Sequence, residues 1–519
     1  MCHDSTNLSA EGLVIGEGPI PLRRIVSVAA GNGFVRISNN SDFLQKIDTS
    51  REQLRAALAA GVPIYGVTTG YGQSCGNRID ALAAAELGNN LIRYHGCGTG
   101  DFLPIIETRA AMLCRLVSLA QGFSGVSEKL LQHLAAVINA NITPLVPSIG
   151  SVGASGDLTP MSYIAAVLQG EQRVQYQGRT MVAAEALQLA GLTPYRFGYK
   201  EQLSMLNGTA IMTGIATTAV ERSRVLLLAA SAATACSLHA LAGHARQFHP
   251  TLVNAKPHPG QQRIGSLLRG LLHSDREVHE SSTDETLQDP YSIRCAPQIL
   301  GVLADGLDWI GRWVENEINS CNDNPLTDPN GGMLMGGNFY GGHIAFAMDS
   351  LKNALATVAD LVDRQIAMLV DQRFSRGLTR GLTVATPGEM AVHHGFKAMQ
   401  ITASALCAEA QKNTMPAMAF SRSTESHNQD IVSQGTLAAR DASRQCLLVG
   451  KVIAIGLLAA VQACEIRGKL EARPQLQLIS KRIRALSPAV LVDRPLDRDI
   501  DAIDEALGAI CSGLEDING

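Results

Sequence analysis

The stretch LAARDASRQCLLVGKVIAIGLLAAVQACEIRGKL, residues 437–470, decides the fold class of this chain. Its apolar residues recur with the spacing of an α-helix, and its many Ala and Leu residues are strong helix formers. The same pattern occurs in residues 210–245, 296–318, 345–369 and 389–412. Because long helices with Ala on their faces pack closely, the sequence predicts a mainly α fold built around a long central helical bundle.

The first 205 residues differ from the rest because they mix short elements of both kinds. Residues 174–177 and 180–182, with Gly178 between them, predict a β-hairpin, whereas residues 50–60 and 81–92 predict helices. Residues 22–28 and 34–37 are predicted as short strands or connecting turns. We therefore expect a smaller mixed N-terminal domain over residues 1–205, and the long-helix bundle with the C-terminal helices over residues 206–519.

Composition excludes several classes of protein. The chain has 43 Lys and Arg against 47 Asp and Glu, and this balance argues against an extended nucleic-acid surface. Residues 1–7 lack the pattern of a secretory leader, and the apolar stretch 225–241 is too short to span a bilayer. The 11 cysteines form no paired framework, and no His or Cys spacing fits a metal site. We expect a cytoplasmic protein with no membrane, nucleic-acid or metal partner.

One short segment, GSVGASGDLTP at residues 150–160, stands out for its chemistry. Glycine permits tight backbone bends, and Pro160 suits the first turn of a following helix. The residues alone allow three interpretations: a turn capped by Asp157 or Thr159, a phosphate-binding loop, or backbone cyclisation. In the third, the Gly156 nitrogen attacks the Ala154 carbonyl carbon, and loss of water makes Ser155 a dehydroalanine. The product is a methylidene-imidazolone, an exposed electrophile.

Seven further motifs accompany this segment along the chain. They are YGVTTGYG at 65–72, LNGT at 206–209, KPHPGQ at 256–261, QDPYSIRC at 288–295, DNPL at 323–326, GGNF at 336–339 and HNQD at 427–430. In kind and order they resemble those of the aromatic amino acid ammonia-lyases and aminomutases, which include histidine, phenylalanine and tyrosine lyases. The resemblance implies a fumarase/aspartase-like architecture and a methylidene-imidazolone formed from Ala154, Ser155 and Gly156, without a diffusible cofactor or metal.

The resemblance also implies roles for single residues, each of which has an ordinary structural explanation when taken alone. Tyr65, at the start of a glycine-rich lid loop, is implied to be the base that removes the substrate's β-proton. Arg294 is implied to pair bidentately with the substrate carboxylate, and Tyr291 to contact or deprotonate the amine. Asn207 would hold the cofactor oxygen or the carboxylate by hydrogen bonds. The remaining implied pocket residues are Gln288, Phe339 and Glu425.

Two positions bear on the choice of substrate. At the position of the pair Tyr94-His95, phenylalanine-preferring relatives have a pair similar to Phe-Leu. Tyrosine-preferring relatives have one similar to His-Leu or Ser-His, and histidine lyases one similar to Ser-His. Tyr94 matches none of these pairs. Gln429 stands where histidine lyases carry Glu, and a neutral amide offers an imidazole no charge. A buried imidazole at His95 left unpaired costs about 1–3 kcal/mol, and a phenol hydroxyl would satisfy it. We therefore expect deamination of tyrosine to p-coumarate, and of phenylalanine to cinnamate as a weaker reaction.

Alternatives within and outside the family stay open. A 2,3-aminomutase would use the same residues and re-add ammonia at the β-carbon, and a histidine ammonia-lyase would share the reaction. A third alternative is a non-catalytic helical scaffold that kept the fold. The resemblance implies a homotetramer whose active sites are shared between subunits, and the apolar faces of long Ala-rich helices support this assembly.

Overall fold

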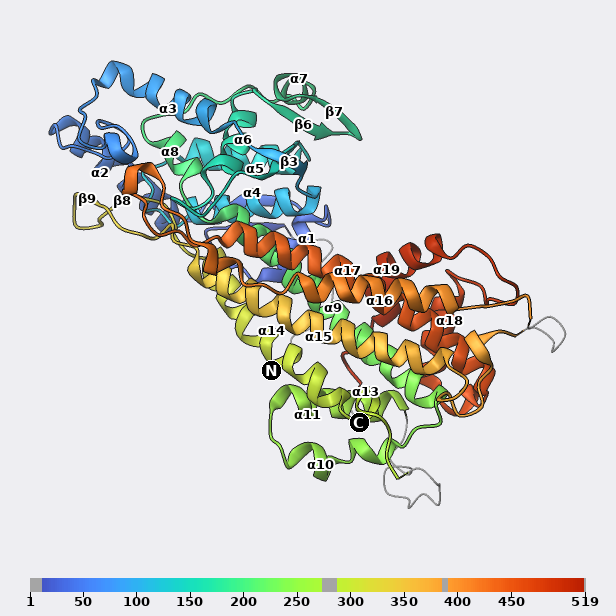
Figure 1. The fold of residues 1–519 in the computed structure, drawn as a ribbon. Coiled ribbons are helices and arrows are strands. Elements are labelled where there is room, and N and C mark those ends of the chain that lie inside the picture. Colours follow the sequence, from blue (N-terminus) through green and yellow to red (C-terminus); the bar gives the residue numbers. More distant parts are fainter. Residues whose placement is uncertain (1–11, 273–286, 385–390, 518–519) are drawn as a thin grey trace. The chain divides into compact units, whose positions relative to one another are not determined.

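The computed structural model describes residues 12–272, 287–384 and 391–517, which are mainly helical (Figure 1). Residues 1–7, for which the sequence predicts no secretory leader, lie outside the described residues. So do residues 389 and 390 at the start of one predicted long helix. The described part of that helix, α16, begins at Lys397 rather than earlier, because residues 391–396 form turns.

The chain forms two compact units, each assembled from three segments of sequence. The first unit comprises Met1–Glu221, Gly311–Asp349 and Pro416–Ser443; the second comprises Arg222–Ile310, Ser350–Met415 and Arg444–Gly519. Four of the five boundaries fall inside long helices, α9 (Ala210–Ala240), α14 (Ala296–Ile318), α15 (Gly342–Val370) and α17 (Gly435–Arg467), and the fifth falls between Met415 and Pro416. The first unit therefore contains more than residues 1–205, because the ends of these helices and their connecting loops also belong to it.

The first unit holds the described strands and most of the shorter helices. The predicted hairpin is confirmed: β6 and β7 pair antiparallel through the turn Gln177–Gly178, whose φ angles of 47° and 74° suit a two-residue hairpin. Its remaining elements have these bounds: β1 (Leu13–Ile15), α1 (Leu22–Ala29), β2 (Val35–Ile37), α2 (Ser41–Ala59), α3 (Ala81–His95), β3 (Thr99–Phe102), α4 (Ile105–Leu119), α5 (Glu128–Asn139), β4 (Thr143–Pro144), β5 (Pro147–Ile149), α6 (Leu158–Leu168), β6 (Arg173–Tyr176), β7 (Arg179–Val182), α7 (Ala183–Leu189), α8 (Glu201–Leu206), β8 (Leu326–Thr327) and β9 (Met333–Leu334).

The interpretation of residues 22–28 as a strand or turn is wrong, because they form helix α1. Leu22, Ile25 and Val28 are buried at helical spacing along one face. The second predicted segment is a strand, β2, which pairs in parallel with β1. Helix α2 begins earlier than predicted because Asn40 caps it, accepting hydrogen bonds from the backbone N–H groups of Asp42 and Phe43.

The second unit is built from helices. Besides parts of the four long helices it contains α10 (Pro250–Asn254), α11 (Pro259–Leu272), α13 (Tyr291–Arg294), α16 (Lys397–Lys412), α18 (Pro474–Arg484) and α19 (Asp497–Cys511). Side-chain amides connect its long helices: Gln365 of α15 donates to Thr234 of α9 over 3.0 Å, and Gln445 of α17 donates to the Lys352 carbonyl over 3.3 Å. The predicted long helices are thus confirmed, with ends that shift by a few residues except at α16, which begins later, at Lys397.

Two described helices, α9 and α17, are long and apolar enough to cross a membrane by length and composition. Their most apolar windows are, however, 72% and 89% buried inside the protein. Burial of this extent is typical of core helices, so they are weak indications of a membrane span.

Candidate active site

A cavity in the first unit collects most of the residues singled out in the sequence. Its wall includes Tyr65, Tyr94, His95, Ala154, Ser155, Gly156, Asn207, Glu425 and Gln429. A second cavity contains Phe339 and shares Tyr65, Ala154, Ser155 and Gln429 with the first. Gln288, Tyr291 and Arg294 belong to the second unit and line neither cavity. Among the described residues, no cluster of His, Cys, Asp and Glu side chains is arranged to hold a metal.

The backbone of residues 153–156 forms a tight turn. Ser155 has φ 52° and Gly156 φ 78°, both in the left-handed region, and the Gly156 N–H donates to the Gly153 carbonyl over 3.4 Å. A Cβ on residue 156 would collide with the backbone of Gly208, so glycine alone fits. The turn therefore has the sharp bend that cyclisation between residues 154 and 156 requires.

Asp157 ties this turn to the start of helix α9 and to residue 436. One carboxylate oxygen accepts the Met212 N–H over 2.9 Å, and the other accepts hydrogen bonds from the hydroxyls of Ser151, at 3.1 Å, and Thr436. Burial raises the pKa of Asp157 to about 6, although these hydrogen bonds lower it. Asp157 precedes α6, but its side chain does not cap that helix, so the capped-turn interpretation is wrong for this residue.

Gly208 holds the turn from the other side by two backbone hydrogen bonds. Its N–H donates to the Ser155 carbonyl oxygen over 3.1 Å, and its own carbonyl accepts the Asp157 N–H over 2.8 Å. Ser155 therefore carries a carbonyl oxygen that already faces a fixed backbone donor.

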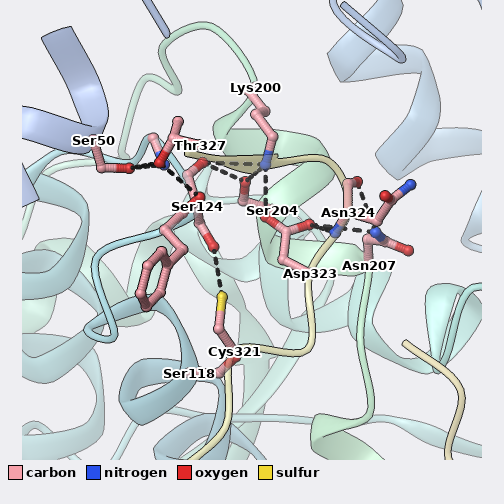
Figure 2. A network of polar contacts seen from close by, with 12 residues as sticks. Ser50, Ser118, Ser124, Lys200, Ser204, Asn207, Cys321, Asp323, Asn324 and Thr327 are labelled. Carbon is pink, nitrogen blue, oxygen red and sulfur yellow. Dashed lines mark hydrogen bonds and ion pairs between the residues drawn. The ribbon is translucent and has the colours of Figure 1, made fainter. Parts of the chain in front are cut away.

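The side chain of Asn207 is oriented by a buried polar network (Figure 2). Its Nδ2 donates to the Asn324 carbonyl over 2.8 Å and to an Asp323 carboxylate oxygen over 3.3 Å. Both partners are acceptors, so the amide oxygen lies on the opposite side, where it accepts no hydrogen bond from the described residues. Asn207 thus offers a ligand an acceptor, whereas holding a carboxylate would need a donor.

A fully buried ion pair keeps Asp323 charged. Lys200 Nζ lies 2.6 Å from the Asp323 carboxylate and also donates to Ser204 and to the Ser124 carbonyl, as Figure 2 shows. Burial raises the pKa of Asp323, but Lys200 and Arg115 outweigh it, so the pKa lies below its usual range. Asp323 is therefore an ionised acceptor that fixes the Asn207 amide.

The phenol of Tyr65 is the candidate base. Its oxygen accepts the Gly72 N–H over 2.9 Å. Burial raises the pKa of Tyr65, the Gly72 hydrogen bond lowers it, and Cys75 and Glu425 raise it further. The net increase means that, in this arrangement, the phenolate forms only at alkaline pH.

His95 closes α3 and stands in the cavity wall next to Tyr94, with ring centroids 4.4 Å apart. Its Nδ1 lies 2.9 Å from the Leu91 carbonyl oxygen, which can only accept, so Nδ1 carries the proton. Burial lowers the pKa of His95. The neutral ring leaves Nε2 as an acceptor with no partner among the described residues.

Several site residues escaped the sequence analysis. Thr424 orients Gln429, Ser151 and Thr436 hold Asp157, and Lys200 and Arg115 support Asn207. Ser151 and Asp323 lie in the quoted motifs, but isolated Lys, Arg and Thr residues carry no signal in one sequence. The partners of Lys200, Arg115 and Thr436 lie 123, 92 and 279 positions away along the chain.

These features define a mainly helical enzyme of the fumarase/aspartase-like fold class, with the Ala154-Ser155-Gly156 turn in the wall of its cavity. The model of the Aromatic amino acid lyase family matches residues 20–485. A histidine ammonia-lyase of Gloeobacter violaceus is 37% identical over 96% of each chain, and a tyrosine ammonia-lyase of Cupriavidus metallidurans is 36% identical over 89% of this chain and 90% of the relative. The crystal structure of tyrosine aminomutase from Streptomyces globisporus superposes with a TM-score of 0.89 at 33% identity, covering 96% of this chain and 97% of that one. The chain belongs to the aromatic amino acid lyase family.

Proposed function

We propose that this enzyme removes ammonia from an aromatic L-amino acid, favouring tyrosine over phenylalanine, to give p-coumarate or cinnamate. One observation carries the proposal: a single cavity wall contains the Ala154-Ser155-Gly156 turn, the Tyr65 phenol and the His95 imidazole. An electrophile, a base and a ring-binding group are the parts that this reaction needs in one place.

The turn fits the prosthetic group that the sequence implies. Cyclisation between Gly156 N and Ala154 C would make the Ser155 carbonyl the carbonyl group of the imidazolone, and the Gly208 N–H already donates to its oxygen. A methylidene-imidazolone supplies an electrophilic carbon that bonds to the substrate amine and makes ammonia a better leaving group. A fixed donor at the ring oxygen supports this chemistry, because negative charge develops there.

The other cavity residues divide the remaining tasks. Tyr65 takes the β-proton, so its phenol must first ionise. The free oxygen of Asn207 fits an N–H of the substrate amine better than its carboxylate. The Nε2 acceptor of His95 pairs with the hydroxyl of tyrosine, whereas phenylalanine would leave it unpaired at a cost of about 1–3 kcal/mol.

In this proposal, another subunit of the assembly supplies the residues that bind the substrate carboxylate. Arg294 and Tyr291 belong to the second unit, where the guanidinium lies 4.5 Å from the Tyr291 ring and the Tyr291 side chain is 68% exposed. We propose a homotetramer in which another subunit supplies these residues to each cavity. A native mass near that of one chain would contradict this arrangement.

Two alternative activities have specific support. Similarity to a tyrosine aminomutase favours 2,3-aminomutation, and similarity to a histidine ammonia-lyase favours histidine as substrate. Gln429 argues against histidine because its amide carries no charge for an imidazole.

Incubation with tyrosine, phenylalanine and histidine, followed by time-resolved NMR, distinguishes these activities. We expect p-coumarate to appear from tyrosine without a lag, faster than cinnamate from phenylalanine. A β-amino acid accumulating before free acrylate would identify an aminomutase, and urocanate as the main product would identify a histidine lyase.

A further inference from the structure

Arg115, in helix α4, is completely buried behind the Ala154-Ser155-Gly156 turn. Its side chain is 0% exposed, and its Nη2 donates to the backbone carbonyl of Asn207 over 2.5 Å. A Cβ on residue 208 would collide with that Nη2, so the guanidinium packs directly against the Gly208 backbone. Arg115 therefore contacts both residues of the Asn207–Gly208 peptide unit.

The same peptide unit contacts the turn at its other end. The Asn207 carbonyl accepts from Arg115, and the Gly208 N–H donates to the Ser155 carbonyl oxygen over 3.1 Å. Hydrogen bonds in such a chain polarise one another, so a cation on the carbonyl strengthens the N–H as a donor. One amide group thus separates the charge of Arg115 from the Ser155 oxygen.

Arg115 forms no ion pair among the described residues; burial lowers its pKa, and the charges of Asp323 and Asp157 oppose this only in part. Its Nε and Nη1 atoms have no hydrogen-bond partner there, and it makes no ion pair. Asp323 pairs with Lys200 at 2.6 Å, and the Asp157 carboxylate accepts its hydrogen bonds from Met212, Ser151 and Thr436, so neither carboxylate forms an ion pair with Arg115. Because arginine stays protonated and an unpaired buried charge disfavours folding, stability alone does not explain this residue.

We propose that Arg115 is a positioning residue that acts through the Asn207–Gly208 peptide on the Ser155 carbonyl oxygen and increases the reactivity of the electrophile formed there. The inference rests on the proposed prosthetic group. When a nucleophile adds to the alkene carbon, the alkene electron pair moves toward this oxygen. A stronger donor at the oxygen lowers the barrier to that addition.

Cyanide is a suitable probe because it needs neither Tyr65 nor a complete substrate site. Its carbon bonds to the terminal alkene carbon, the displaced electron pair moves toward the Ser155 carbonyl, and a proton from water completes the adduct. Mass spectrometry of the peptide that contains residues 150–160 gives both the fraction that has lost two waters and the rate at which this fraction gains cyanide. The readout is the rate of cyanide gain by the peptide that has lost two waters.

The variants are Arg115→Met, Arg115→Lys and the control Arg109→Met. Arg109 is a second buried arginine of α4, 4% exposed, and it donates to the carbonyls of Ala29, Ile138 and Val28 rather than to the turn. Both methionine variants remove a buried guanidinium from the same helix, so a thermal unfolding measurement on each reports any change in stability separately from the trapping rate. Only the Arg115 variants should change the trapping rate.

We expect Arg115→Met to slow trapping about tenfold, Arg115→Lys to slow it less because the charge is kept, and Arg109→Met to stay within about twofold of wild type. Trapping within about twofold in folded Arg115→Met overturns the inference. If Arg115→Met does not fold or does not form the prosthetic group, the trapping rate of Arg115→Lys is judged by the same limit of about twofold. A wild-type peptide without loss of water would refute the proposed function instead.

Discussion

The side-chain amide of Gln429 donates from Nε2 to Ser155 Oγ over 3.1 Å, and its oxygen accepts the Thr424 hydroxyl over 2.9 Å. The two contacts fix which end of the amide faces the turn. Gln429 therefore touches the hydroxyl that must be lost to form the alkene, and it lines both cavities. The position that we expect to bear on histidine selectivity thus also contacts the serine that is proposed to form the alkene.

Gln429→Glu should move substrate preference toward histidine. A carboxylate can still accept from Thr424, and it adds a negative charge that pairs with an imidazole. We expect kcat/KM for histidine to rise about tenfold and that for tyrosine to fall, measured on both proteins with the water-loss fraction as a control for maturation. An unchanged value for histidine would show that residue 429 does not face the substrate ring.

His95→Phe should reduce the preference for tyrosine over phenylalanine. The change removes the Nε2 acceptor, and a buried phenol hydroxyl left unpaired costs about 1–3 kcal/mol, which corresponds to about 5- to 150-fold in the ratio of kcat/KM values. Phenylalanine itself should lose little. If the ratio changes less than about twofold, the tyrosine preference loses its main support.

Glu425→Gln should shift the pH dependence of turnover to lower pH. In the proposed reaction the phenolate of Tyr65 is the active form of the base; burial and Glu425 raise the pKa of Tyr65, so the rate should rise with pH toward that pKa. Removing the carboxylate charge lowers the pKa of Tyr65 and moves the rising limb of kcat/KM against pH downward. A limb that stays in place or moves upward would contradict the assignment of Tyr65 as the base.

Arg294→Lys should weaken turnover without unfolding the protein. One ammonium cannot reproduce the two parallel hydrogen bonds of a guanidinium to a carboxylate, so we expect a loss of about 2–4 kcal/mol in transition-state stabilisation from kcat/KM. An unchanged kcat/KM would show that another residue holds the carboxylate, and it would remove one reason to propose shared active sites.

Much of the fold could be predicted because its signals are local. The apolar periodicity of α9, α14, α15 and α17 spans many turns, and the Gln177–Gly178 turn identifies its hairpin within a few residues. The prediction for residues 22–28 is wrong because a short apolar run is compatible with a strand or a helix. The burial of Leu22, Ile25 and Val28 on one face favours the helix.

The candidate site could be predicted where its residues lie in a sequence motif, and not where contacts between distant parts of the sequence bring its residues together. The turn at residues 154–156 is visible in its sequence, but Lys200 meets Asp323 across 123 positions and Gln429 meets Ser155 across 274. A buried arginine such as Arg115 looks like a surface residue in one sequence. The sequence also could not show that Asn207 presents its oxygen, because Asp323 and Asn324 decide that orientation.

The mass of the peptide containing residues 150–160 tests the central claim most directly. Cyclisation of Ala154 with Gly156 removes one water, and conversion of Ser155 to an alkene removes a second. We predict that the freshly purified protein yields this peptide two waters lighter than its sequence, whereas folded Ser155→Ala lacks the second loss and has no turnover. A wild-type peptide at its full sequence mass, in protein that still deaminates tyrosine, would contradict the account.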